Sequence, residues 1–371
     1  MTAVYPAEPD PDLSFSGWGD PSLVPELPEA VRQLLAEGLG VRGGSPAPAS
    51  ISQLKPPSPR LGDDAVAALQ ALVGPADVLT DDESRVRHLR GKSTPDLLRL
   101  RAGDLGGAPD AVVLPATHDE VLAVLRACSE RQIAVIPYGG GTSVVGGLEP
   151  DASRFPALVA LDVRHMNALT RLDEESRLAV LEPGLRGPQA EQLLGAGGYT
   201  LGHFPQSFEY ATLGGFAAAR SSGQASAGYG RFDELVLALT VATPSGPLSV
   251  GRAPRTAAGP DLRQLILGSE GTLGVITSLT LQVRPIPEAR VYDGWRFASF
   301  ADGLAAIRRL AQDGPVPTVL RLSDETETAL NLARPGELGS AGGEGGCLAI
   351  AGYEGADDEV VARGSQATLL L

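Results

Sequence analysis

A glycine-rich loop directly after a short apolar run is the feature that most restricts how this chain folds. The stretch AVIPYGGGTSVVGGLEP, residues 134–150, holds three consecutive glycines at 139–141 and a second pair at 146–147. The apolar residues 133–136 in front of the loop predict a β-strand. Because glycine has no Cβ atom, successive backbone amides can turn into one concavity, which binds phosphate without a charged side chain. The pattern therefore predicts a phosphate-binding loop at the end of a strand.

Neither common phosphate fingerprint is present in this loop. The P-loop pattern requires a lysine after its glycines, and none follows here. The dinucleotide pattern GxGxxG fails because Val144 occupies the third glycine position when Gly139 and Gly141 take the first two. A turn that only tolerates glycine is the alternative that the residues themselves leave open.

The formal net charge of −15 argues against several function classes. A strongly negative protein repels nucleic acids and anionic membranes, so a phosphate ligand needs backbone amides, helix ends or arginines. Cys128 and Cys347 form no disulfide framework, and the four histidines are not spaced as metal ligands. Without a signal peptide or an apolar run long enough to span a membrane, we expect a soluble cytoplasmic protein with no metal site and no nucleic-acid partner.

Composition divides the chain into three parts. Residues 1–62 are predicted to form an N-terminal extension and Pro-rich linker, with a short helix at 28–39. A strand–helix rhythm over 63–287 predicts the main domain, and 288–371 reads as the start of a second α+β domain with a flexible loop at 334–346.

Local patterns predict the individual elements. Thr117 and Glu120 form a capping box before a helix whose Val121, Leu125 and Cys128 share one face. Strands are expected at 110–115, 133–137, 157–162, 177–184, 234–246, 317–324 and 347–355, and from 275 onward. Helices are expected at 117–132 and 187–198 and after 261, and a strand followed by a helix is expected within 290–314.

Four segments, in order, resemble the PCMH-type FAD-binding domain of the flavin oxidases related to vanillyl-alcohol oxidase. They are PYGGGTSVVGG at 137–147, GHFPQSFEYATLGGFAAARSSG at 202–223, GYGRFDELVLALTVATPSG at 228–246 and LGSEGTLGVIT at 267–277. The resemblance spans 78–287 and implies the α+β fold class, in which a two-subdomain FAD-binding domain is followed by the start of an α+β cap domain.

Within this family the details resemble the alkylglycerone-phosphate synthases, flavoenzymes that form the ether bond of ether lipids. The supporting segments are GWGDPS at 17–22, GKSTPDLLRLRAGD at 91–104, RSSGQASAGYGRFDELV at 220–236, RPIPE at 284–288 and VLRLSD at 319–324. The resemblance implies exchange of the acyl group of an acyl-dihydroxyacetone phosphate for a fatty alcohol. It implies FAD as cofactor and a small or lipid-like phosphate substrate, and it allows a homodimer.

The resemblance assigns FAD contacts to four segments. Amides of the glycine loop hold the diphosphate, the segment ending at Thr212 reaches the flavin ring, and a strand edge at Val275 and Ile276 pairs with the pyrimidine edge of that ring. The assigned residues are Pro137, Tyr138, Gly139, Gly140, Gly141, Thr142, Ser143, Gln206, Ser207, Phe208, Glu209, Tyr210, Ala211, Thr212, Ala219, Arg220, Ser221, Ser222, Glu270, Gly271, Thr272, Leu273, Gly274, Val275 and Ile276.

Several single residues bear on how FAD is held and on which side chains take part in chemistry. Thr142 stands where covalent relatives have a histidine, so FAD is expected to be held non-covalently. Ala219 replaces a threonine of the family pattern, and Arg220 either faces a phosphate or forms a structural ion pair. His203 and Glu270 are more often structural or positioning residues than acids or bases.

Arg321 in VLRLSD is the candidate catalytic residue, because it stands where the synthases carry an active-site arginine. A guanidinium fork suits a phosphate-bearing substrate, and a surface arginine is the alternative. The C-terminal half of the family supplies a tyrosine and a histidine cluster that have no counterpart before Leu371. Two other expectations therefore stay open, an oxidoreductase of the D-2-hydroxy-acid dehydrogenase type and an inactive flavin-binding fragment.

Overall fold

The computed structural model describes residues 5–6, 13–20, 29–38, 40–41, 50–149, 152–254, 256–332 and 346–371. Contacts divide the chain into two compact units, each of which is described by itself. Unit 1 comprises Met1–Ser22, Ala47–Ser222 and Arg231–Arg284, and unit 2 comprises Leu23–Pro46, Gly223–Gly230 and Pro285–Leu371. Nearly all of the predicted flexible loop at 334–346, and 27 of the 62 residues of the N-terminal extension, lie outside the described residues.

The division between the units falls near the predicted domain boundary but places two segments differently. The sequence placed the boundary after 287, whereas the contacts place it after Arg284. Residues 13–20 and 50–62, predicted as extension and linker, belong to unit 1. The physical reason is apolar packing, because Phe15 and Leu54 join a small core of this unit.

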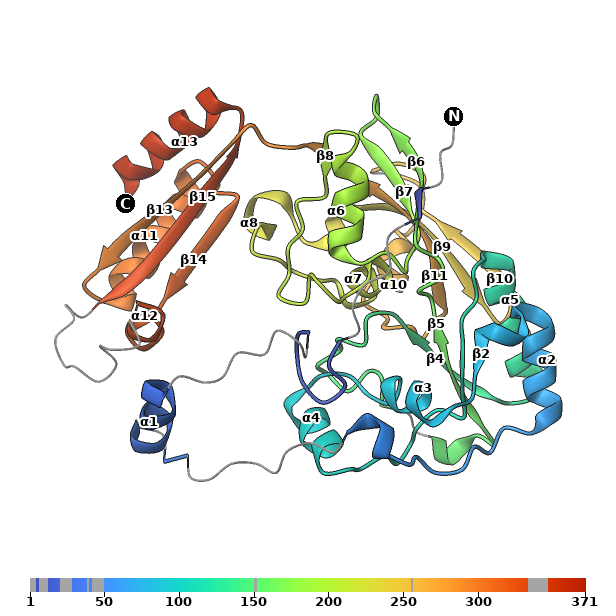
Figure 1. The fold of residues 1–371 in the computed structure, drawn as a ribbon. Helices are drawn as coiled ribbons and strands as arrows, with labels where there is room; N and C mark the ends of the chain where they lie inside the picture. The colour runs from blue at the N-terminus through green and yellow to red at the C-terminus, as the bar shows by residue number, and fades with distance from the viewer. Residues whose placement is uncertain are drawn as a thin grey trace. The chain divides into compact units, whose positions relative to one another are not determined.

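The first sheet of unit 1 brings the glycine loop to a parallel edge. Its strands are β2 (Val78–Leu79), β3 (Ala111–Val113), β5 (Leu158–Asp162) and β4 (Ala134–Tyr138), in that spatial order. β3, β5 and β4 are parallel, and β2 pairs antiparallel with β3. Figure 1 labels β2, β4 and β5 of this sheet. The glycine loop follows Tyr138, so it begins at the carboxyl end of a parallel strand, where α/β folds bind ligands.

Helix α5 (His118–Glu130) packs against this sheet and confirms the predicted capping. The Thr117 hydroxyl accepts a hydrogen bond from the Glu120 amide at 3.2 Å. The Glu120 carboxylate accepts one from the Ala116 amide at 2.7 Å. The apolar face of α5 is buried in one core with α2 (Asp63–Val73), as the periodicity predicted.

The second sheet of unit 1 is antiparallel and has six strands. They are β1 (Tyr5–Pro6), β6 (Ala168–Asp173), β7 (Leu178–Leu181), β11 (Val275–Gln282), β9 (Val236–Thr243) and β10 (Gly246–Val250), in spatial order. Their inward residues form the largest apolar core of this unit. α5 contacts β9 and β11 as well as β4, so it packs against both sheets.

Short elements complete unit 1 and carry most of its connections. They are the 3-10 turns Ile51–Gln53, Pro75–Asp77 and Ala152–Arg154, and the elements α3 (Asp82–Arg87), α4 (Thr94–Arg101), α6 (Gly187–Gly195), β8 (Tyr199–Thr200), α7 (Leu213–Ala219), α9 (Phe232–Leu235) and α10 (Arg263–Ile266). The sequence predicted Gly195 or Gly197 as the cap of α6. Instead Ala196 ends the helix and Gly198 takes the positive φ of +81°.

Unit 2 is built on a three-stranded antiparallel sheet in the order β13-β15-β14. Its elements are α1 (Glu29–Gly38), α8 (Ser226–Tyr229), β13 (Ala289–Phe297), α11 (Phe300–Asp313), β14 (Val319–Ser323), α12 (Glu325–Leu332), β15 (Cys347–Gly355) and α13 (Asp357–Leu370), with β12 (Arg284–Pro285) at the division. α11 and α13 pack on one face of the sheet around the buried Leu310 and Tyr353. The sequence predicted these three strands and α11 but not α13.

Candidate cofactor site

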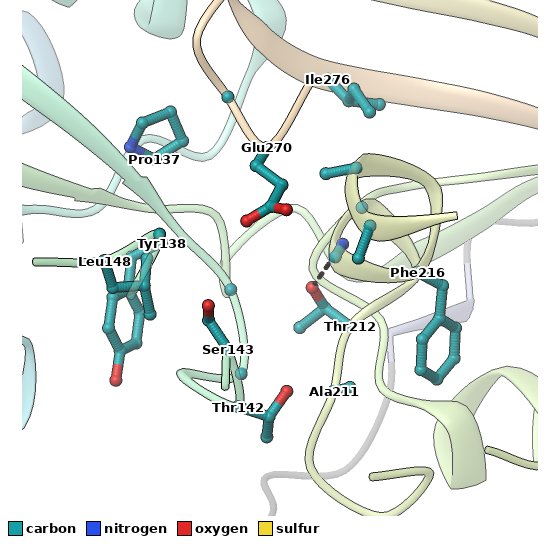
Figure 2. A pocket seen from close by; sticks show the side chains of 18 of the residues that line it. Pro137, Tyr138, Thr142, Ser143, Leu148, Ala211, Thr212, Phe216, Glu270 and Ile276 are labelled. Carbon is teal, nitrogen blue, oxygen red and sulfur yellow. Dashed lines mark hydrogen bonds between the residues drawn. The ribbon is translucent and has the colours of Figure 1, made fainter. Parts of the chain in front are cut away.

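Unit 1 holds a cavity of about 360 Å³ beyond the carboxyl end of β4 (Figure 2). Three segments contribute most of its lining: the glycine loop, the chain around α7, and the turn that leads into β11. The lining residues are Pro137, Tyr138, Gly139, Gly140, Gly141, Thr142, Ser143, Val144, Val145, Gly147, Leu148, Val163, Pro183, Ser207, Ala211, Thr212, Gly214, Gly215, Phe216, Ala218, Ala219, Ser221, Ser269, Glu270, Gly271, Gly274, Val275 and Ile276.

Close packing explains the run of glycines, in addition to backbone geometry. A Cβ atom on Gly140 would lie 2.7 Å from the carbonyl carbon of Tyr210 and nearer still to its oxygen. Gly141 has a φ of +67°, and a Cβ there would overlap the Tyr138 hydroxyl. Real Cβ atoms do not approach backbone this closely, so the loop can rest on residue 210 only while it has no side chain.

A buried charge cluster anchors the root of the loop. The fully buried Asp162, at the end of β5, accepts hydrogen bonds from His88 Nε2 and Arg164 Nε, each at 2.8 Å. Burial acts to raise its pKa, but the hydrogen bonds and charges of His88 and Arg164 lower it overall. The His88 ring lies 4.4 Å from the ring of Tyr138, whose hydroxyl donates to the Arg87 carbonyl at 3.0 Å. The cluster therefore fixes the last residue of β4.

Two observations show that the cavity fits a phosphate-bearing ligand. Ser143 Oγ is buried in the lining and has no hydrogen-bond partner among the described residues. A buried hydroxyl without a partner costs free energy until a ligand supplies one. The described residues of the lining also include no lysine, arginine or histidine, so backbone amides and hydroxyls are the donors that they offer. An amide cradle of this kind suits a diphosphate in a protein of net charge −15.

Thr212 connects the glycine loop to α7. Its Oγ1 accepts the amide of Gly215 at 3.2 Å, which is the bond drawn in Figure 2, and thereby caps the helix. The hydroxyl proton is left to donate to a ligand. A Cβ on Gly139 would overlap this hydroxyl. Thr212 therefore lines the cavity, and its contact with the flavin stays a prediction.

The turn before β11 brings a carboxylate to the cavity. Glu270 has a left-handed backbone with a φ of +49°, held by a bond from its amide to the Ala218 carbonyl at 3.1 Å. Figure 2 shows its carboxylate pointing into the space between Ser143 and Thr212. An ionised carboxylate only accepts hydrogen bonds, so it suits the sugar hydroxyls of a nucleotide rather than its phosphates.

The start of β11 leaves one strand edge open toward the cavity. β11 pairs with β9 from Val275 onward, but with β7 only over Leu279–Gln282. The second edge at Val275 and Ile276 therefore faces no strand of the described chain, and both residues line the cavity. Backbone donors and acceptors there can pair with the edge of a planar ring, as the resemblance expects.

Eight of the residues assigned from the sequence do not line the cavity. They are Gln206, Phe208, Glu209, Tyr210, Arg220, Ser222, Thr272 and Leu273. Some of these are used in packing: Phe208 stacks against Phe204 at 5.0 Å, and Tyr210 is buried below the loop.

The side chain of Arg220 decides between two alternatives that the sequence left open. Its guanidinium pairs with Asp233 at 3.1 Å and donates to the carbonyls of Leu267 and Gln264 at 3.0 and 2.9 Å. Of the two alternatives, the structure therefore shows the structural ion pair. The same side chain connects α7 to the turn before β11. A motif gives a residue's position in the chain and not the direction of its side chain, so a backbone contact of Arg220 with FAD stays a prediction.

Several lining residues were not assigned from the sequence. They are Val144, Val145, Gly147, Leu148, Val163, Pro183, Phe216, Ala218 and Ser269. The glycine pair at 146–147 was a signal that the sequence offered, whereas Val163 and Pro183 are brought to the cavity only by the fold.

His203 is a core residue rather than a general base. It is 2% exposed, its ring lies 5.1 and 5.2 Å from those of Phe216 and Phe232, and its Nε2 is 3.0 Å from Ser221 Oγ. Burial lowers its pKa from 6.5 to about 4. The side chain is therefore neutral at physiological pH and packs behind α7.

This burial predicts an acid-sensitive step in stability. The unfolded chain protonates His203 near pH 6.5 and the folded chain only near pH 4. Lowering the pH from 6.5 to 4 should therefore cost about 3 kcal/mol of unfolding free energy through this residue. Urea unfolding of the wild type and of His203→Leu at pH 7 and pH 4.5 measures it, with the exposed His165→Leu as control. An unchanged pH dependence in His203→Leu would contradict the assignment.

Arg321 lies in unit 2 on β14, half exposed and paired with Glu327. Neighbouring Leu320 belongs to the core under α11 and α13, so Arg321 is on the opposite face of the sheet. The structure thus presents its guanidinium to solvent within unit 2, and its catalytic role stays a prediction.

Two family models match the chain in sequence order. The FAD binding domain matches residues 109–250, and the C-terminal domain of FAD linked oxidases matches 286–370. None of the helices in the described ranges is long and apolar enough to cross a bilayer, and no group of three or more His, Cys, Asp or Glu among those residues is arranged to hold a metal.

The chain is similar to alkyldihydroxyacetonephosphate synthases from several organisms. It is 37% identical to the protein from Dictyostelium discoideum over 276 residues, which is 74% of this chain and 45% of that protein. It is 33% identical to the one from Trypanosoma brucei brucei over 352 residues, which is 88% of this chain and 57% of that protein. The chain thus spans about half the length of these curated relatives. A solved alkyldihydroxyacetonephosphate synthase matches with a TM-score of 0.86 and 31% identity, covering 97% of this chain and 73% of that one.

Proposed function

Because this chain belongs to the PCMH-type FAD-binding family and to its alkyldihydroxyacetonephosphate synthase group, we propose that it forms the FAD-binding and cap portions of such a synthase. The reaction exchanges the acyl group of an acyl-dihydroxyacetone phosphate for a fatty alcohol in ether lipid synthesis. The observation that carries the proposal is the match to a solved synthase across both family domains. A lipid-like phosphate substrate and a homodimer belong to the same proposal.

The residues of the cavity bind and orient FAD. Amides of 138–143 and the Ser143 hydroxyl hold the diphosphate, and Glu270 accepts hydrogen bonds from sugar hydroxyls. The open edge at Val275 and Ile276 pairs with the pyrimidine edge of the ring. Thr142 offers no nucleophilic nitrogen, so the cofactor is held non-covalently. Bound FAD supplies the electron-accepting ring at which the exchange takes place.

The lining supplies binding rather than acid–base chemistry. Among the described residues that form it, only Tyr138 and Glu270 have ionisable side chains. Burial raises the pKa of Tyr138 above its ordinary value, so the phenol stays protonated. Arg321 of unit 2 is the proposed cation for the substrate phosphate, which would take the place of its carboxylate partner Glu327.

Anaerobic stopped-flow mixing separates the synthase from the dehydrogenase alternative. The FAD-loaded chain is mixed with D-lactate or D-2-hydroxyglutarate. A synthase makes no net redox change, so the visible flavin absorbance should persist with both acids. Reduction by dithionite serves as the control that the flavin is accessible. Rapid bleaching by either hydroxy acid would overturn the proposal in favour of a D-2-hydroxy-acid dehydrogenase.

A second assay tests the exchange itself. The loaded chain is incubated with an acyl-dihydroxyacetone phosphate and a labelled fatty alcohol, and the lipid product is analysed. The proposal expects label in an ether-linked phosphate. FAD binding by the chain without any exchange would favour the inactive flavin-binding alternative.

A further inference from the structure

A buried lysine links the N-terminal segment of unit 1 to the glycine loop. We propose that residues 13–20, named here the N-terminal strap, set the affinity for FAD by holding Lys92, which positions Ser143 in the loop. The inference rests on the proposed placement of the FAD diphosphate at 137–143. Lys92 does not line the cavity, so it acts as a positioning residue.

The side chain of Lys92 is held by the strap. Lys92 is 6% exposed, and its Nζ donates hydrogen bonds to the carbonyls of Ser14 and Phe15 at 2.5 and 2.7 Å. Burial, followed by the charge of Arg87, lowers the pKa of Lys92 to about 8. An ammonium this deep needs acceptors, and the strap provides the two that its contacts show. Without the strap, Lys92 would have to turn toward water.

The backbone of Lys92 holds the glycine loop. Its amide donates to the Ser143 carbonyl at 2.7 Å. A Cβ on the preceding Gly91 would overlap the same carbonyl, so the two chain segments lie in direct contact. Ser143 is the residue whose hydroxyl is buried in the lining without a partner. A shift of Lys92 therefore moves the donor that the cavity presents to phosphate.

The strap is anchored independently of Lys92. The Arg101 Nε donates to the Ser16 carbonyl at 2.9 Å, and Phe15 packs against the core formed by residues such as Leu54 and Val86. Ser16 is buried. Because of these contacts, the strap stays in place even when the Lys92 side chain moves. The strap can therefore restrict the position of Lys92. Pre-organising a loop in its bound geometry raises affinity because less order is created on binding.

The affinity for FAD should depend on the contact between the strap and Lys92. We expect Lys92→Met, which keeps the length of the side chain but loses its donors, to weaken FAD binding about 10-fold, the effect of one charged hydrogen bond. Phe15→Ala should weaken it in the same direction without altering the lysine. Lys55→Met is the matched control, because Lys55 is exposed and pairs only with Asp82 among its described contacts. Val250→Ala, in the core below the other sheet, controls for general destabilisation.

Lysine labelling tests the coupling in the unmutated protein. Lys55 and Lys92 are the only lysines of the sequence, so acylation followed by peptide mapping reads each one separately. Saturating FAD should slow acylation of Lys92 several-fold and leave acylation of Lys55 unchanged, although neither lysine lines the cavity. Phe15→Ala should speed acylation of Lys92 in the absence of FAD.

The outcomes distinguish this inference from the proposed function. If the wild type binds FAD but Phe15→Ala binds it equally well, and FAD leaves the labelling of Lys92 unchanged, the strap does not control the loop and the inference fails. If the wild type binds no FAD at all, the proposed function fails first. A loss of affinity in Val250→Ala equal to that in Phe15→Ala would also overturn the inference, because it would reflect stability alone.

Discussion

Replacing Gly140 by alanine is expected to reduce the affinity for FAD at least about 100-fold, which corresponds to about 2.7 kcal/mol. The added methyl carbon would lie 2.7 Å from the Tyr210 carbonyl carbon and 2.9 Å from the Ala211 Cα. Both obstacles are backbone, so no flexible side chain can move aside, and the loop must separate from segment 210–212. The amides that face the cavity would move with it. Calorimetric titration with FAD measures the loss.

The control for this substitution is another glycine in the same unit. Gly195, at the end of α6, has no neighbour within 4 Å of its Cβ position, and its φ is not positive. Gly195→Ala should bind FAD as the wild type does. If Gly140→Ala retained wild-type affinity while folded, the close contact between the loop and residue 210 would not be needed for binding.

Replacing Asp162 by alanine should be the most destabilising single change near the site. The carboxylate is fully buried, and its loss leaves His88 and Arg164 without their shared anionic partner. Breaking a buried pair in this way costs about 3–5 kcal/mol. Because the His88 ring packs against Tyr138, the root of the glycine loop should loosen as well. Denaturant unfolding and FAD titration of the same variant measure the two effects.

The pH dependence of this pair has a defined sign. The pKa of Asp162 is lowered in the folded state, so its stabilisation is fully present above the ordinary carboxyl pKa and is lost as the pH falls through the folded value. Asp173→Ala, on the surface at the end of β6, is the control and should change the unfolding midpoint far less. If the two substitutions lowered the free energy of unfolding equally, the Asp162 cluster would not contribute specifically to stability.

Local patterns were enough to find the elements around the site. The Thr117 and Glu120 pair predicted the start of α5, and the run ending at residue 137 predicted the strand that carries the loop. These signals lie within a few residues of one another, so tertiary structure hardly alters them. The glycine run also predicted where a phosphate-bearing ligand would bind, and the cavity lies there.

Long-range contacts decided what the sequence could not show. His88 and Asp162 are 74 residues apart, so the sequence gave no sign that they form a pair. The folded sheet brings them together. Lys92 and Ser14 are 78 residues apart. Nothing in the Pro-rich extension predicted that the Ser14 carbonyl would accept a hydrogen bond from Lys92. Arg220 matched a motif, yet its guanidinium pairs with Asp233, 13 residues further along the chain. The sequence did not show in which direction these side chains point or which residues they pair with.

The central claim is that backbone amides and hydroxyls, without basic side chains, hold the diphosphate of FAD in an anionic protein. Calorimetric titration of the chain with FAD and with FMN, at low and high salt, tests it most directly. We predict that FMN, which lacks the adenosine and one phosphate, binds at least about 100-fold more weakly than FAD. The affinity for FAD should not fall as salt increases, because no ion pair to the phosphates is screened. Equal affinity for FMN, or a steep loss of FAD affinity with salt, would contradict the account.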